Sequence, residues 1–102
     1  MRMPLQHAPD SEAAHTIALQ ALAFLASDGE RLGRFLALTG MGPAELKAQA
    51  GDTALLQGVL DHLMRDESLL LVFASDAGLK PEQVAAAFHA LGQVQRARGR
   101  HG

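Results

Sequence analysis

The sequence contains no cysteine, tryptophan or tyrosine, and its aromatic carbocycles are four phenylalanines. Without cysteine there is no disulfide framework, no thiolate nucleophile and no thiolate metal ligand. No unbroken apolar run exceeds six residues, the length of Leu69 to Ala74, whereas a membrane-spanning helix needs about 20. The first nine residues also lack the apolar core of a signal peptide. These absences predict a cytoplasmic protein without a membrane segment.

β-Branched residues are also scarce, with one isoleucine, four valines and three threonines, while alanine and leucine dominate. That composition favours helix over strand. Apolar residues make up 48% of the chain and charged residues 20%, which is the range of a folded globular domain and not of a disordered chain. A length of 102 residues leaves room for one domain. The sequence therefore predicts a single all-α domain.

The basic residues lie mostly outside the middle of the chain. Residues 10–95 hold all eleven acidic residues but only five of the nine basic ones, so their net charge is −6. Arg96, Arg98 and Arg100 stand together near the C-terminus. A nucleic-acid-binding domain needs its cations clustered on one face, so this distribution disfavours nucleic acid as a partner. We expect a flexible tail over 1–9, a helical domain over 10–96 and a flexible basic tail over 97–102.

The chain reads as two copies of one unit. A shift of 38 residues aligns 17–48 with 55–86 without a gap and gives eight identical pairs. The most informative pairs carry residues that start or stop helices: Asp28 and Asp66, Gly40 and Gly78, Pro43 and Pro81. An aspartate caps a helix N-terminus, a glycine adopts the left-handed conformation after a helix, and a proline fits the first helical position. The pattern predicts two pseudo-repeated three-helix units.

The helix-start and helix-stop signals predict about six short helices. In the first unit they run over 11–26, 29–39 and 43–50, and in the second over 53–64, 67–77 and 81–96. Ser27 with Glu30 three residues on forms a capping-box pattern for the second helix. Asp52 and Asp66 are the expected N-caps of the fourth and fifth helices.

Differences between the copies indicate a candidate interaction surface. Arg31 and Arg34 stand where the second copy has Leu69 and Val72. The helix over 67–77 is apolar on every side, and the helix over 11–26 has only a narrow polar line, so some apolar surface should stay exposed. The candidate surface comprises Leu19, Arg31, Arg34, Leu69 and Val72. We predict a non-catalytic protein-interaction or adaptor module that binds a protein partner or a second copy of itself.

Residues 73–91 also resemble a DNA-binding helix-turn-helix, with Gly78 in the turn. The recognition helix would present Gln83 and His89, and Arg96, Arg98 and Arg100 would contact the phosphate backbone. That helix carries no cation before Arg96, and the same glycine joint recurs at Gly40, where it is explained by helix packing. The DNA-associated function is therefore the alternative to the interaction module.

Catalytic, cofactor-binding and metal-binding residues are not predicted. The five histidines show no spacing typical of a metal site, and no glycine-rich phosphate loop occurs. Adjacent residues such as Asp61 and His62 point about 100° apart on a helix and form no dyad. We expect no enzyme activity and no cofactor.

Three segments carry a resemblance to a known family: IALQALAFLA at 17–26, RLGRFLALTG at 31–40 and LLLVFA at 69–74. The chain resembles a short, uncharacterised family of alphaproteobacterial proteins, a domain of unknown function. The resemblance covers nearly the whole chain apart from its tails. It implies a small helical bacterial protein and transfers no catalytic or binding residue.

Overall fold

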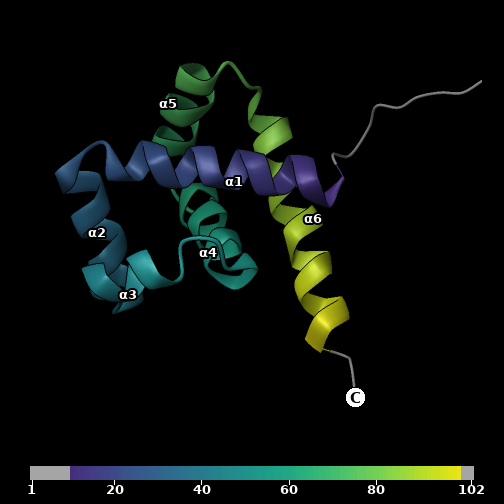
Figure 1. Ribbon diagram of the computed structural model, residues 1–102. Coiled ribbons are helices and arrows are strands. Elements are labelled where there is room, and N and C mark those ends of the chain that lie inside the picture. The colour runs from purple at the N-terminus through teal and green to yellow at the C-terminus, as the bar shows by residue number, and fades with distance from the viewer. Residues whose placement is uncertain (1–9, 100–102) are drawn as a thin grey trace, which may run out of the picture.

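The computed structural model describes residues 10–99, which form six α-helices and no strand (Figure 1). The helices are α1 (Ser11–Ala26), α2 (Gly29–Thr39), α3 (Pro43–Ala48), α4 (Thr53–Met64), α5 (Glu67–Ala77) and α6 (Pro81–Gly99). The all-α prediction and the number of helices are confirmed. The expected bounds hold for α1, α2, α4 and α5, whereas α3 ends two residues early and α6 continues three residues beyond 96.

The three helices α1, α4 and α6 pack against one another and form the centre of the molecule (Figure 1). The helix α2 packs on α1, and α5 packs on α4, α6 and α1. The short helix α3 makes few close approaches to any other helix. The two longest helices, α1 and α6, are also those that pack most extensively on other helices. This agrees with the rule that most helical stability in proteins comes from tertiary packing. Within residues 10–99, no helix is long and apolar enough to cross a bilayer.

Matching side chains start the second helix of each unit. Asp28 accepts hydrogen bonds from the backbone N–H groups of Glu30 and Arg31, at 2.9 and 3.3 Å. Asp66 accepts one from the N–H of Leu69 at 3.1 Å, as expected. Asp52 is the N-cap residue of α4, but its side chain makes no capping hydrogen bond.

The capping box predicted at Ser27 is wrong. Ser27 still has right-handed helical backbone angles, with φ −77° and ψ −7°, so it ends α1. Its hydroxyl donates to the carbonyl of Phe24 at 2.8 Å. An N-cap residue needs an extended backbone, which the next residue, Asp28, supplies with φ −135° and ψ 112°.

Two glycines end the second helix of each unit, as predicted. Gly40 has φ 76° and Gly78 has φ 71°, both in the left-handed region. In each case the N–H of the following residue returns to the helix: Met41 donates to the carbonyl of Leu36 at 3.2 Å and Leu79 to that of Ala74 at 2.8 Å. These are the hydrogen bonds of a Schellman motif. The glycine joints are therefore helix caps in both places.

The contacts between the two units are reciprocal. Phe24 in α1 packs on Phe73 in α5, with ring centroids 5.4 Å apart, and His62 in α4 packs edge-on against Phe35 in α2 at 5.2 Å. Residue 62 lies 38 positions after 24, and 73 lies 38 after 35, so the second contact is the first with the units exchanged. This exchange is the pattern expected if the two predicted units are related by a two-fold axis. Phe35 and Phe73, which occupy equivalent positions in the two contacts, are both buried.

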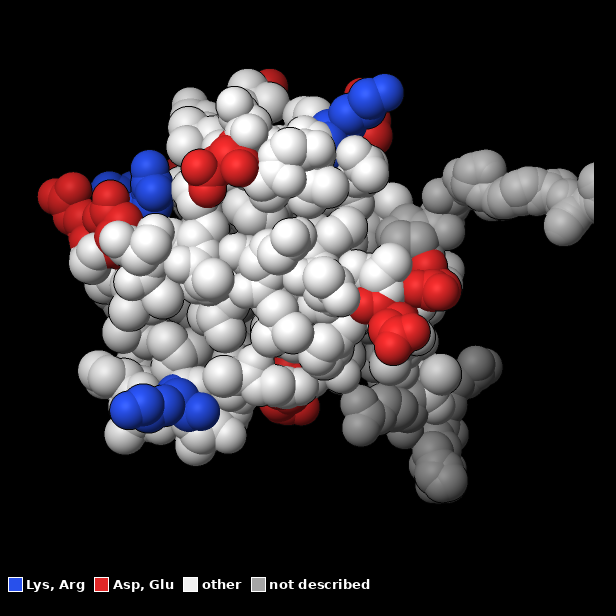
Figure 2. Space-filling model, turned by 45° about the horizontal axis from the view of Figure 1, so that its top comes forward, with Lys and Arg blue, Asp and Glu red and all other residues white. Residues whose placement is uncertain are grey.

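The outer side of α1 carries no charge over most of its length, because residues 13–27 contain no Asp, Glu, Lys or Arg. Figure 2 turns the α5 side of the molecule toward the viewer and shows a broad central area without charged side chains. Most of the acidic and basic residues in this view stand around that area.

Candidate interaction site

A pocket of about 270 Å³ lies between α2, α4 and the start of α5. Its lining combines side chains from all three: Glu30, Arg31, Arg34, His62, Asp66 and Leu69. Three residues of the candidate interaction surface, Arg31, Arg34 and Leu69, therefore come together in one place. They are 35 to 38 positions apart between α2 and α5, and the packing of α2 and α5 around α4 unites them.

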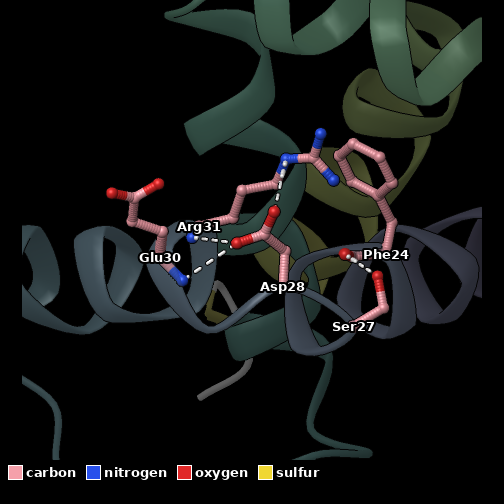
Figure 3. Close-up of polar contacts among 5 residues, drawn as sticks. All are labelled: Phe24, Ser27, Asp28, Glu30 and Arg31. Atoms are coloured by element: carbon pink, nitrogen blue, oxygen red, sulfur yellow. Dashed lines mark hydrogen bonds and ion pairs between the residues drawn. The ribbon is translucent and has the colours of Figure 1, made fainter.

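Arg31 is held at the edge of this pocket by neighbours on two sides (Figure 3). Its guanidinium carbon lies 4.4 Å from the ring centroid of Phe24, which is a cation–π contact. Its Nε is 3.9 Å from a carboxylate oxygen of Asp28, the residue that caps α2. Arg31 thus contacts a side chain of α1 and the cap of its own helix.

Arg34 stands one turn after Arg31 on the same side of α2. It is exposed, and among the residues that the structure describes no carboxylate lies within 4.0 Å of its guanidinium group. The pocket also contains the carboxylates of Glu30 and Asp66. Asp66 is already engaged as the cap of α5 through the N–H of Leu69. The guanidinium group of Arg34 is available to an added carboxylate.

His62 lines the pocket from α4 and is half-buried. Burial lowers the pKa of its imidazole below the ordinary histidine value, and the charge of Arg34 acts in the same direction, while Asp66 and Asp61 raise the pKa. The net result is a lowered pKa, which favours the neutral imidazole. Sequence reasoning missed this residue. The signal for it was the 38-residue shift, which places His62 where the first unit has the buried Phe24.

The lowered pKa of His62 makes stability dependent on pH in a defined direction. Below the unfolded-state pKa of about 6.5 the unfolded chain takes up a proton that the folded chain resists, so the free energy of unfolding should fall as pH drops from about 7 toward the lower folded pKa. The groups that face the imidazole are Arg34, Asp61 and Asp66, with Glu30 and Arg31 in the same pocket.

Replacement by phenylalanine, His62→Phe, should remove this part of the pH dependence. Urea denaturation of both proteins at pH 7.5 and 5.5 measures it. We expect the variant to lose less stability than the wild type between the two pH values. Equal losses in the two proteins would contradict a folded-state pKa below the unfolded one.

The other two residues of the candidate surface, Leu19 and Val72, do not line the pocket. They are exposed, Leu19 by 41% on α1 and Val72 by 46% on α5. Val72 follows Leu69 by three residues on α5 and lines a separate hollow with Leu71, Ser75 and Asp76. Two further exposed leucines were not predicted: Leu71, which is 47% exposed, and Leu38, which is 71% exposed. Leu38 stands one turn after Arg34, and that spacing was the available signal.

Gln83, His89 and Arg96 of the DNA-binding alternative lie on α6, and the side chain of Gln83 contributes to the start of that helix. The side-chain oxygen of Gln83 accepts a hydrogen bond from the N–H of Lys80 at 2.9 Å, just as Glu45 accepts from Gly42 at 3.3 Å before α3. His89 and Arg96 are exposed. The side chain of Arg98 and all of Arg100 lie outside the described residues. Among residues 10–97, no cluster of three or more His, Asp or Glu side chains is placed to hold a metal ion.

The chain was compared with known proteins at the levels of family, curated sequence and solved structure. It matches no curated protein and no solved structure. A family model described as "Protein of unknown function (DUF3572)" matches residues 11–94, which extend from the first residue of α1 into the last turns of α6. Because the match covers most of the chain and all six helices, the protein belongs to this family.

Proposed function

We propose that the protein is a non-catalytic interaction module, and that the pocket of Arg31, Arg34 and Leu69 receives an acidic segment of a protein partner. The observation that carries this proposal is the convergence of these three residues in one pocket, about one helical turn along α5 from the exposed Val72. A carboxylate of the partner pairs with Arg34, and apolar side chains next to it pack on Leu69 and Val72.

The order of Arg31 supports this proposal. Binding normally costs the rotamer freedom of each side chain that becomes fixed, about 0.5–1.5 kcal/mol for a flexible one. The contacts of Arg31 with the ring of Phe24 and the carboxylate of Asp28 favour one arrangement of its side chain before a partner binds. Arginine is also enriched among the residues that dominate binding energy at protein interfaces.

The chemistry of the pocket is better suited to recognition than to catalysis. The described residues that line it include no serine, threonine, tyrosine or lysine, and one of its two carboxylates, that of Asp66, caps α5. His62 makes its aromatic contact with Phe35, which supports the packing of α2 on α4. The absence of enzyme activity and of a cofactor is part of the proposal, as are the cytoplasmic location and the alphaproteobacterial origin expected from the sequence.

Charge favours a protein partner over DNA. The domain has a net charge of −6 over residues 10–95, which repels a duplex. The exposed side of α6 presents Glu82, Gln83, His89 and Gln93 before Arg96, its first cation. A recognition helix of this composition offers few donors to phosphates and base edges.

The test is affinity capture from the source cell after nuclease treatment, with tagged wild-type protein and two charge-matched variants. Arg34→Glu reverses the charge in the pocket, and Lys80→Glu makes the same change at an exposed site outside it. We expect one saturable protein partner that wild type and Lys80→Glu retain equally and that Arg34→Glu binds about tenfold more weakly, as for loss of an interfacial charge pair.

The dissociation constants should then be measured with the purified partner. Equal affinity of the Arg34→Glu and wild-type proteins would contradict the proposal. Retention of only a second copy of the chain, detected by light scattering, would replace the partner by a homodimer. A partner that is retained without nuclease treatment and lost after it would favour the DNA-binding alternative.

A further inference from the structure

A second, apolar groove of about 440 Å³ lies in the first unit, away from the arginine pocket. Its walls are Leu22 and Ala26 of α1, Leu32 of α2 and Leu46 of α3. Ala50 also lines it, and Lys47 is its one charged lining residue. None of these residues lines the arginine pocket, so the two sites are separate.

The second unit shows what is missing from this groove. A shift of 38 residues leaves two of its walls unchanged, since Leu22 and Leu32 become Leu60 and Leu70. The same shift replaces two small residues by large ones: Ala26 becomes Met64 and Ala50 becomes Phe88. Met64 and Phe88 are partly buried and pack against the core. In the first unit no side chain of this size stands at either position.

The third helices of the two units, α3 and α6, also differ in how closely they pack on the rest of the molecule. The helix α6 packs directly on α4, whereas α3 makes few close approaches to α1. The matching helix caps and the reciprocal aromatic contacts show that the two units otherwise share one plan. The 38-residue shift thus matches Ala26 and Ala50 of the groove with Met64 and Phe88, with the difference that Ala50 follows the end of α3 whereas Phe88 lies within α6.

We propose that this groove binds an amphipathic helix of a partner protein, which inserts a phenylalanine where the second unit has Phe88. Engineered apolar cavities of about 150 Å³ bind benzene, so a phenyl group fits a groove of this size. Lys47 is exposed, and the ion pairs of the described residues do not include it. A carboxylate beside the inserted phenylalanine pairs with its ammonium group, which makes the partner helix acidic next to its aromatic residue.

The sequence of the second unit also supplies a peptide probe for a test. The probe is a synthetic peptide with the sequence of residues 81–97 and the change His89→Glu, which places a carboxylate next to Phe88. It is titrated into the ¹⁵N-labelled full chain, and amide shifts are followed by NMR. We expect saturable shifts at Leu22, Ala26, Leu32 and Ala50, and about tenfold weaker binding when the peptide carries Phe88→Ala.

Protein variants test the groove from the inside. Ala50→Phe and Ala26→Met each introduce the side chain of the second unit, and either one should abolish the shifts. Ala37→Phe makes the same change at an exposed position of α2 outside the groove and should leave the affinity unchanged. Lys47→Glu should weaken binding about two- to fivefold, the range of an exposed ion pair.

The absence of shifts at 1 mM peptide would overturn the proposal, as would equal binding by the Phe88→Ala peptide or by the Ala50→Phe protein. Unchanged affinity in Lys47→Glu would overturn its acidic part. Groove shifts on deletion of residues 1–9 would assign the groove to the chain's own N-terminal segment. A dimer that Ala50→Phe dissociates would assign it to a second copy. The arginine pocket is unaltered in all these variants, so their outcome leaves the function proposed for it untouched.

Discussion

The substitution Phe73→Ala is expected to lower the free energy of unfolding by about 3–5 kcal/mol, the range for a fully buried phenylalanine. Phe73 is 1% exposed. Its ring packs on Phe24 of the other unit, so truncation leaves a cavity at the contact between α1 and α5. The helices around it are parts of one core and cannot collapse independently to fill that space.

The equivalent residue in the first unit should respond alike. Phe35 is completely buried and packs on His62, so Phe35→Ala should cost a similar amount. The control is Leu38→Ala on the same helix, where the side chain is 71% exposed and the cost should stay below about 0.5 kcal/mol. Urea denaturation of the three variants measures these differences. A Phe73→Ala protein as stable as the Leu38→Ala protein would contradict a shared aromatic core.

The helices were predictable because their ends depend on local chemistry. A glycine at positive φ, a proline at the first helical position and an aspartate cap act within a few residues of sequence, and each is visible in the printed chain. Gly40 and Gly78 end α2 and α5 as the pattern predicts. The failure at Ser27 has a local reason too, since two capping residues stand side by side and only the backbone angles decide between Ser27 and Asp28. The shift of 38 favours Asp28, which pairs with Asp66.

The site was only partly predictable, because it depends on which helices meet. The sequence pointed to Arg31, Arg34 and Leu69 as differences between the copies, and the structure brings them to one pocket. It could not show that the ring of Phe24 lies under Arg31, since that contact requires the turn between α1 and α2 to fold back. The place of His62 in the site could not be predicted, because it depends on a contact with Phe35, which is distant in the sequence and close in space.

The surplus of apolar surface was predicted from α1 and α5, and its location is now specific. The apolar helix α5 buries Leu70, Phe73 and Ala74 and leaves Leu71 and Val72 nearly half exposed. The helices α4, α6 and α1 cover its inner side, and Leu71 and Val72 share the outer side with polar residues such as Ser75 and Asp76. The groove between α1, α2 and α3 could not be predicted from apolar supply, because it depends on how these three helices lie against one another.

Replacement of the glycine cap, Gly78→Val, is expected to destabilise the protein by about 2 kcal/mol. Left-handed backbone angles cost an L-residue about 1–2 kcal/mol, and β-branched residues resist them most. Gly78 has φ 71°, and a Cβ added there would meet no atom within 4 Å, so the cost comes from the backbone conformation and not from a clash. The change also strains the joint that directs the chain from α5 into α6.

The matched control is Gly33→Ala in the interior of α2, where a Cβ also meets no atom within 4 Å but φ is not positive. Alanine favours a helix interior over glycine by about 1 kcal/mol, so this variant should be more stable than the wild type. The two glycine variants should therefore move the urea midpoint in opposite directions. If Gly78→Val unfolds at the wild-type urea concentration while Gly33→Ala is stabilised, Gly78 does not cap α5 in the way its backbone angles indicate. If both lose stability, side-chain crowding, and not the sign of φ, controls these positions.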